Sequence, residues 1–294
     1  MTTYAKTLPM KRILCLFVFI FFSLTQLSAQ PAKSSLLWEI SGNGLQHPSY
    51  LFGTFHMMCK EDFAITGILE SKLKASEQFY GEIDMDQPNL QANMISRIMM
   101  QGKTLETLLG EDYKSTNEKF QSITGMSMAM LNNFKPFYCL SLLVINSTQC
   151  KESIQPEAAF TAVAKQNHLQ IRGLETIDEQ FDVIDKEPID SQINALKKIV
   201  GNFDSVKTMM SQLMTVYKTK NIDSLFSFMK STGANEDFGT ELLDKRNKKW
   251  IPLMKKAMLE KASFFAVGAG HLGGTEGVIS LLRKEGYRLT PVMY

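Results

Sequence analysis

YLFGTFH at residues 50–56 and FFAVGAGH at residues 264–271 share one pattern, an apolar strand that runs into Gly-x-x-His. Each stretch precedes a segment with helical spacing and then a second strand, so the chain predicts two related β-Gly-x-x-His-α-β units. With 18 glycines and 4 histidines in 294 residues, chance produces this spacing only ~0.25 times, so two copies are informative. We interpret His56 and His271 as the two halves of one site.

The predicted fold class is α/β, with a central mixed sheet built by two pseudo-symmetric halves. In the first half, a helix at 65–76 is expected to connect the motif to a buried strand at 78–84. In the second half, a helix at 275–285 is expected to lead to a final strand at 287–292. Helical periodicity dominates the chain between them, so a large helical insertion is predicted at about 88–258.

The two histidines are expected at one edge of the sheet. Parallel strands end at a common edge, and open α/β sheets bind ligands in the crevice there. Glu82, at the end of the strand at 78–84, is expected at the same edge. Two imidazoles and a carboxylate are typical ligands of a catalytic divalent metal, and they also suit metal-free acid–base chemistry. Each motif glycine is expected to allow unusual dihedrals or the close approach of a ligand.

Two further residues are candidates for the same site. Thr176 and Glu179 have the spacing of a capping box, which predicts a helix start and places Glu175 at a strand-to-helix turn. Arg246 follows an apolar helical stripe, and its guanidinium suits a bidentate hold on a carboxylate. Histidine and glutamate at strand ends are also ordinary turn residues, and for Arg246 the alternative is a solvated helix face.

Residues 1–29 have the features of a secretory signal peptide. A positively charged start precedes an apolar run at 13–24, and small residues lead to a cleavage point after Ala29. The run is shorter than the roughly 20 residues of a membrane span. We therefore expect an exported protein, periplasmic or secreted, whose mature chain at 30–294 forms a single domain without a transmembrane anchor.

The charge balance of the mature chain argues against polyanionic partners. Removal of the three cations at Lys6, Lys11 and Arg12 from a total of 32 leaves 29 basic residues against 30 acidic ones. A net charge near −1 creates no general field for nucleic acid or anionic lipid. We therefore expect no nucleic-acid partner.

Three cysteines remain after removal of the predicted signal peptide. Cys139 lies in an apolar helical stretch, where a core position is expected. Cys59 and Cys150 lie in polar, loop-like contexts, and export favours a disulfide between them. The alternative for Cys59, three residues after His56, is a role as ligand or nucleophile.

Methionine is frequent in the predicted insertion, notably at residues 94, 99, 100, 126, 128, 130, 209, 210 and 214. These side chains favour gap-filling in a core, and the alternative is an adaptable apolar groove for peptides. The chain contains neither a Gly-x-Ser-x-Gly elbow nor His-Glu-x-x-His, which argues against an ordinary serine esterase or a zincin.

Several separated motifs together resemble the TraB/GumN family over most of the mature chain. They are residues 50–56, 82–84, 135–137, 173–176, 246–247 and 265–274. The resemblance implies a fold related to erythromycin-esterase-like and ChaN-like haem-binding proteins. It also implies kinship with the animal Tiki proteins, membrane-tethered metalloproteases that need both Gly-x-x-His motifs and a glutamate, with manganese or cobalt. By this likeness His56, Glu82 and His271 carry the site, and Glu175 and Arg246 lie nearby.

The leading hypothesis is an exported, metal-dependent hydrolase that acts on peptides or proteins. His56, Glu82 and His271 are its expected ligands for a manganese, cobalt or zinc ion, and Arg246 or a backbone amide of 270–274 is expected to stabilise the oxyanion. Two alternatives stay open. One is a binding protein that captures a peptide or a haem-like ligand without turnover, and the other is a metal-free esterase.

Overall fold

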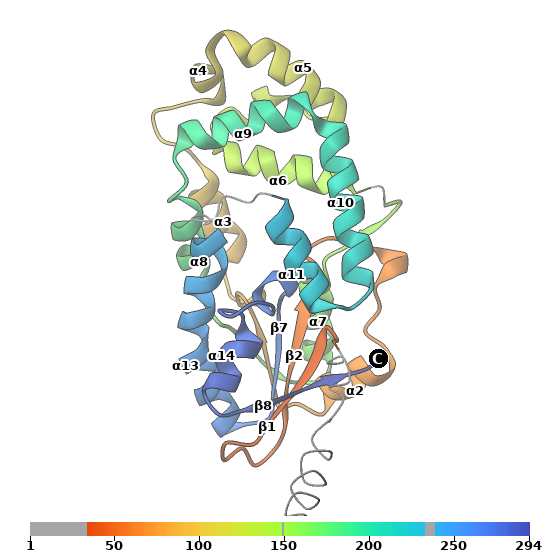
Figure 1. Cartoon of the computed structure of the whole chain (residues 1–294). Coiled ribbons are helices and arrows are strands. Elements are labelled where there is room, and N and C mark those ends of the chain that lie inside the picture. Colours follow the sequence, from red (N-terminus) through yellow and green to blue (C-terminus); the bar gives the residue numbers. More distant parts are fainter. Residues whose placement is uncertain (1–33, 149, 233–238) are drawn as a thin grey trace, which may run out of the picture. The chain divides into compact units, whose positions relative to one another are not determined.

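A six-stranded sheet carries both Gly-x-x-His motifs (Figure 1). The structure is a computed structural model that describes residues 34–148, 150–232 and 239–294. The strands of this sheet are β1 (Leu37–Ser41), β2 (Ser49–Thr54), β4 (Gln78–Gly81), β6 (Gln170–Gly173), β7 (Ser263–Gly268) and β8 (Arg288–Val292). A second, two-stranded sheet pairs β3 (Met58–Cys59) with β5 (Ser153–Ile154).

The two predicted halves interleave in the six-stranded sheet. The strand order is β6-β4-β7-β2-β1-β8, in which β6, β4, β7 and β2 pair in parallel and β1 is antiparallel to β2 and to β8. The first half, β2 to β4, therefore has its second strand beyond β7. The second half, β7 to β8, has its second strand beyond β2 and β1. The α/β class with a mixed central sheet is confirmed, and interleaving places the two motif strands side by side.

The helices follow the predicted segments with shifts of a few residues at their ends. They are α2 (Gly67–Lys74), α3 (Leu90–Ile98), α4 (Leu105–Leu109), α5 (Tyr113–Thr124), α6 (Pro136–Ser147), α7 (Pro156–Gln166), α8 (Ile177–Ile184), α9 (Ile189–Gly201), α10 (Phe203–Lys218), α11 (Ile222–Ser231), α13 (Lys245–Glu260) and α14 (Val278–Lys284). Residues 240–244 form a π-helical turn directly before α13.

Local sequence signals explain several of these boundaries. The side chain of Thr176 accepts a hydrogen bond from the N–H of Glu179, whose carboxylate accepts one from the N–H of Thr176. This confirms the predicted capping box at the start of α8. Gly286 follows α14 with a φ of 89°, a conformation that glycine adopts without steric cost.

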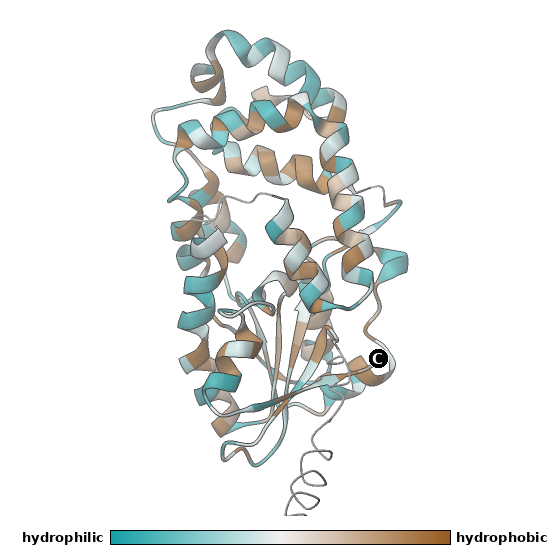
Figure 2. Cartoon of the chain, in the orientation of Figure 1, coloured by the Kyte–Doolittle hydropathy of each residue, from teal (hydrophilic) through white to brown (hydrophobic). Residues whose placement is uncertain are grey.

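The core divides between the sheet and the helical insertion. Strand residues such as Phe52, Phe79 and Phe264 pack with α7 and α13 in the largest apolar cluster. A separate cluster joins α4, α5, α6 and α9, and Figure 2 shows more hydrophobic residues along α6 than along α5. The methionines differ in burial: Met128 is fully buried, as expected of a core residue, whereas Met130 is 72% exposed.

The predicted disulfide is present. Cys59 and Cys150 are bonded, with their Cα atoms 5.0 Å apart, so Cys59 is not a free nucleophile. Cys139 is a buried free thiol, as expected. The bond connects the segment after the first motif to the loop before β5. It therefore ties the chain that leads into α7 to the chain that follows His56.

The predicted signal peptide at 1–29 lies outside the described residues. Within residues 34–148, 150–232 and 239–294, none of the helices combines the length and the apolar character that a membrane crossing requires.

The motif glycine Gly53 is required by close packing rather than by its dihedrals. Neither Gly53 nor Gly268 has a positive φ, so the expectation of unusual dihedrals is wrong. A Cβ on Gly53 would lie 3.0 Å from Cβ and 3.1 Å from Cα of Ala269, and 2.9 Å from the Leu272 side chain. The first motif therefore uses glycine to admit the turn of the second motif.

Replacing Gly53 with alanine is expected to lower the free energy of unfolding by about 1–3 kcal/mol, the cost of overpacking a core. Urea denaturation measures this change. Gly201→Ala is the matched control, because a Cβ there has no neighbour within 4 Å. Gly201 ends a helix, so the control should gain up to about 1 kcal/mol. Equal stability of Gly53→Ala and wild type would contradict the packing argument.

Candidate active site

The pairing of β2 with β7 brings the two histidines to one cavity. Thr54 lies opposite Gly268 at the carboxyl end of these parallel strands. His56 follows β2, and His271 ends the 3₁₀ turn at 269–271 that follows β7. Both side chains line one cavity of about 360 Å³. Two residues separated by more than two hundred positions thus meet at the edge where ligands bind in α/β sheets.

The pairing of β4 with β6 brings two carboxylates to the same edge. Gly81 lies opposite Gly173. Glu82 is the residue after β4, and Glu175 is the second residue after β6. The backbone N–H of Glu175 donates to the carbonyl of Glu82 over 2.9 Å. Both glutamates are buried, with 6% and 7% of their surface exposed. Burial of two carboxylates is unfavourable unless a cation accompanies them.

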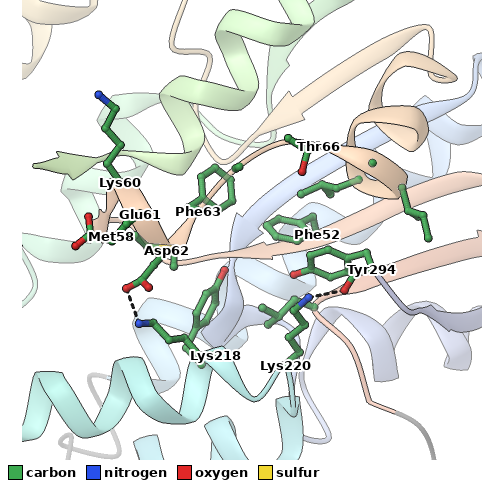
Figure 3. A pocket seen from close by; sticks show the side chains of 16 residues that line it. Phe52, Met58, Lys60, Glu61, Asp62, Phe63, Thr66, Lys218, Lys220 and Tyr294 are labelled. Atoms are coloured by element: carbon green, nitrogen blue, oxygen red, sulfur yellow. Dashed lines mark hydrogen bonds and ion pairs between the residues drawn. The ribbon is translucent and has the colours of Figure 1, made fainter.

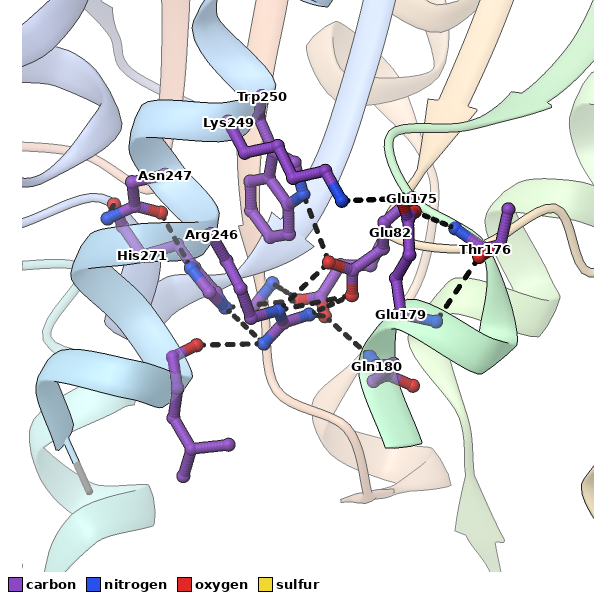
Figure 4. A network of polar contacts seen from close by, with 12 residues as sticks. Glu82, Glu175, Thr176, Glu179, Gln180, Arg246, Asn247, Lys249, Trp250 and His271 are labelled. Carbon is purple, nitrogen blue, oxygen red and sulfur yellow. Dashed lines mark hydrogen bonds and ion pairs between the residues drawn. The ribbon is translucent and has the colours of Figure 1, made fainter. Parts of the chain in front are cut away.

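Arg246 of α13 supplies that cation at the centre of the network in Figure 4. Its Nε lies 3.1 Å from both carboxylate oxygens of Glu175, and its Nη2 lies 2.5 Å from Oε1 of the same residue. Nη2 also donates to Oε2 of Glu82 over 2.7 Å. Nη1 donates to the Leu242 carbonyl and contacts Nε2 of His271 at 3.2 Å. Four of the five predicted site residues, all but His56, therefore lie in one hydrogen-bonded cluster.

The tautomer of His271 follows from its neighbour Asn247. The Asn247 amide nitrogen donates to the carbonyls of His271 and Glu276, so its oxygen is an acceptor. That oxygen lies 2.7 Å from Nδ1 of His271, which therefore carries the proton. The Nε2 lone pair is left to accept from Arg246. Burial and the charge of Arg246 outweigh Glu82 and lower the pKa of His271 to about 3, so the ring is neutral.

This neutral histidine should make the fold sensitive to acid. Between its ordinary pKa of 6.5 and about 3, the unfolded chain binds a proton that the folded chain does not. The free energy of unfolding should therefore fall as pH decreases from 6.5, by up to about 1.4 kcal/mol per pH unit. Urea denaturation at pH 6.5, 5.5 and 4.5 measures this slope. His271→Gln should flatten it and the exposed His47→Gln should retain it; equal slopes in both variants would refute the assignment.

The pKa values of the two buried glutamates are shifted in opposite directions. Burial alone would raise the pKa of Glu82, but the charges of His56 and Arg246 and the N–H of Gly268, 2.7 Å from Oε1, hold it well below its usual value. The pKa of Glu175 is raised, because burial and the charge of Glu82 outweigh its hydrogen bonds to Arg246. Glu82 is therefore the stable carboxylate beside the cavity.

His56 lies outside the buried cluster and has a partner of its own. Its Nδ1 lies 2.8 Å from Oε1 of Glu157, and 72% of its side chain is exposed. Thr54 Oγ1 donates to the same oxygen over 2.5 Å. A carboxylate can only accept, so Nδ1 carries the proton and Nε2 is the free nitrogen. The sequence analysis missed Glu157, since an acidic residue in the first turn of a helix is ordinary.

Glu157 also determines the charge of His56. Desolvation lowers the pKa of His56, but the hydrogen bond to Glu157 and the charges of Glu82 and Glu157 outweigh it and raise the pKa to about 9. Because most of the ring is exposed, solvent weakens each of these effects, and the upward direction follows from the hydrogen bond. His56 is therefore mainly protonated at neutral pH.

Two possible metal-ligating atoms border the motif glycine Gly268, and a third lies near one of them. A Cβ on this residue would lie 3.2 Å from Oε1 of Glu82 and 3.4 Å from Nε2 of His56, and Nε2 of His271 lies 3.7 Å from the same oxygen. In both imidazoles an acceptor holds Nδ1, as in metal-binding histidines. Nε2 is unprotonated in His271 and loses its proton reversibly in His56. Their nitrogen and carboxylate donors, and the acceptors that orient the two rings through Nδ1, fit a divalent transition metal.

The residues are not yet gathered as a ligand group. Within residues 34–148, 150–232 and 239–294, no three acidic, histidine or cysteine side chains lie close enough together to hold a metal ion. Arg246 lies against both Glu82 and His271, so a metal at Nε2 of His271 requires the guanidinium to withdraw from that nitrogen.

Comparison with known proteins agrees with the motifs. The sequence profile of the TraB/PrgY/gumN family matches residues 36–291. The chain belongs to the TraB/PrgY/gumN family. It is 24% identical over 321 residues to the metalloprotease TIKI1 of Homo sapiens and 23% identical over 319 residues to the metalloprotease TIKI homolog of Amphimedon queenslandica. Each alignment covers 88% of this chain and 62% of the relative. No solved structure matches the chain at a significant level.

This TraB/PrgY/gumN chain also has a larger cavity, of about 550 Å³, away from the histidines (Figure 3). Its lysines already have partners: Lys60 pairs with Glu152, and Lys218 lies 2.5 Å from Asp62. Lys220 donates to the Tyr294 carbonyl over 2.5 Å and lies 3.6 Å from the centre of that ring. The cavity shares no lining residue with the one at His56 and His271, so we do not assign it to the active site.

Proposed function

We propose that this chain is a hydrolase that cleaves peptide bonds at the site of His56, Glu82 and His271. The observation that carries the proposal is the meeting of both Gly-x-x-His histidines at one cavity, with each Nδ1 held by an acceptor. The substrate class is supported by the relatives, which are named metalloproteases. The alignments cover 62% of these longer relatives, and peptide cleavage by this chain is our proposal.

His56 is the proposed base. Its exposed Nε2 accepts a proton from the attacking water, and Glu157 stabilises the imidazolium that forms. The buried His271 is the wrong residue for this step, because its Nε2 accepts from Arg246. Arg246 lines the cavity beside both histidines, and its positive charge stabilises the developing oxyanion.

A divalent ion is the proposed cofactor, and His56, Glu82 and His271 are the residues that would hold it. Nε2 of His56 would then be a ligand, so His56 serves as the base only in the ion-free site. When bound, a manganese, cobalt or zinc ion supplies Lewis-acid polarisation of the carbonyl and a more acidic water. The donor chemistry around Gly268 supports this assignment.

Digestion of an unbiased peptide library, with product analysis by mass spectrometry, tests the proposed function. The purified chain should cleave peptides, and dialysis against a chelator should remove activity that manganese, cobalt or zinc restores. Metal content before and after dialysis shows whether an ion was bound. Cleavage that persists in full in the chelator would refute the metal and leave the hydrolase. Absence of cleavage under every metal condition would refute the hydrolase.

The rate of cleavage should increase with pH. His56 must be neutral to accept a proton, and its pKa of about 9 predicts a roughly tenfold rise in kcat/KM per pH unit below pH 9. Glu157→Gln removes the negative charge beside Nδ1, so the midpoint of the profile should move down toward the ordinary value of 6.5. A pH profile of kcat/KM for both proteins measures this shift. An unchanged midpoint would mean that Glu157 does not set the protonation of His56.

We also propose that the protein acts outside the cytoplasm. The features of residues 1–29 support cleavage of a signal peptide, and the Cys59–Cys150 bond suits an oxidising compartment. Cell fractionation with N-terminal sequencing should recover a chain that begins at Gln30 in the periplasm or the medium.

Capture of a peptide without turnover is the second candidate. The apolar lining of the cavity at His56 favours capture, because such a lining binds apolar side chains whether or not a bond is cleaved. Tight binding in calorimetry with intact peptide after prolonged incubation would select capture over hydrolysis.

A further inference from the structure

The cavity at the two histidines has a mainly apolar lining with a few polar residues. The ionisable ones are His56, Arg246 and His271, and Thr54 and Thr148 add hydroxyl groups. The apolar wall comes mainly from the helical insertion and includes Val144 of α6, Met210 and Leu213 of α10, Met229 of α11, and Leu242 and Leu243 of the π-helical turn. None of the described residues that line it is acidic. Its single permanent cation, Arg246, is already paired with Glu82 and Glu175.

The apolar wall reaches the catalytic turn itself. A Cβ on Gly270 would lie 2.8 Å from Cε and 3.4 Å from Sδ of Met229, so this methionine packs directly on the turn that ends in His271. A methionine side chain is flexible and adapts to the shape of an apolar ligand. A group seated against Met229 would therefore lie within reach of both histidines.

A second, smaller cavity lies on the other side of His56. It has a volume of about 190 Å³, and its lining includes Gln155, Glu157 and Gln180 together with Glu82. His56 is the one residue that lines both cavities. The base of the proposed reaction therefore separates a large apolar space from a smaller space with carboxylate and amide groups.

We infer that the cavity at the two histidines, of about 360 Å³, is a specificity pocket for a bulky apolar side chain next to the bond that is cleaved. Leucine, methionine and phenylalanine are such side chains. The inference rests on the proposed function, and it adds the chemical class of the substrate. A lysine side chain would lose its hydration against this wall and find no acidic partner among the described lining residues. Alanine would leave the wall unfilled.

A set of alanine-based pentapeptides that differ only at the central residue tests the pocket. Wild type should cleave the leucine and phenylalanine peptides about 10- to 200-fold faster, in kcat/KM, than the alanine peptide, the range that apolar pockets achieve for small differences in size. The lysine peptide should be the poorest substrate, because none of the described lining residues is acidic.

Val144→Glu and Ile145→Glu form a matched pair of variants. The two residues are neighbours on α6 and are each 38% exposed, but only Val144 lines the cavity. Val144→Glu should lower kcat/KM for the leucine peptide at least tenfold, leave the alanine peptide within about threefold and improve a lysine peptide. Ile145→Glu should match wild type on all of them. Met229→Ala should shift the preference from leucine toward phenylalanine, because it enlarges the pocket.

The outcomes separate this inference from the proposed function. Cleavage of all central residues at equal rates would overturn the pocket and leave the hydrolase. Equal effects of Val144→Glu and Ile145→Glu would overturn it as well. If no peptide is cleaved, calorimetry with the same peptides still tests the pocket. Tighter binding of the leucine peptide than of the lysine peptide supports it, and equal affinities overturn it.

Discussion

Arg246→Met should lower the free energy of unfolding by about 3–5 kcal/mol, the effect of removing one partner from a buried ion pair. Arg246 is 7% exposed and makes its contacts with Glu82 and Glu175, which are equally buried. Without the guanidinium, two carboxylates would remain side by side in the interior with no cation between them. Urea denaturation at neutral pH measures the loss.

Lys249→Met is the control for this prediction. Lys249 is on the same helix and is paired with Glu179, but its side chain is about half exposed, so the loss should stay below about 1 kcal/mol. Arg246→Lys should fall between the two, because lysine keeps the charge but cannot hold Glu175 through Nε and Nη2 together. A loss below 1 kcal/mol for Arg246→Met would show that the cluster is not what stabilises this edge of the sheet.

His56→Ala should lower kcat/KM by about 10²–10⁴-fold, the usual contribution of a positioned acid–base group. The fold should be nearly unaffected, because most of the His56 side chain is exposed and its contact is a single pair with Glu157. Steady-state kinetics on the best library peptide measures the rate, and thermal unfolding verifies that the variant is folded.

His47→Ala is the control for His56→Ala. His47 is an exposed residue in the turn before β2, so its replacement should leave the rate within about twofold of wild type. If His56→Ala retains the wild-type rate, His56 is not the base, and the proposed site has to be rebuilt around the buried cluster. A fall in rate together with a large loss of stability would instead point to a structural role.

Patterns that are local in the sequence predicted the framework. Alternation and buried runs located β2, β4, β7 and β8, and the spacing of Thr176 and Glu179 located the start of α8. Such signals work because strand pleating and helix capping depend on residues within a few positions of one another. The pairing of Cys59 with Cys150 was also predictable, because the third cysteine lies in an apolar helical stretch.

Contacts between distant segments were beyond these patterns. Glu157 lies 101 positions from His56 and Asn247 lies 24 positions from His271, yet they hold the Nδ1 atoms of the two rings. The role of Gly53 was misjudged for the same reason: the neighbours that exclude a side chain there, Ala269 and Leu272, belong to the other half of the sheet.

The sequence by itself determined that the chain has two strand-Gly-x-x-His units, a helical insertion between them and a disulfide, because each leaves a signature in residue types and spacing. Only the tertiary structure decided that β2 lies beside β7 and that Arg246 joins Glu82, Glu175 and His271. Strand order depends on which apolar faces bury one another. The charge state of each histidine depends on the partners that this order brings within hydrogen-bonding distance.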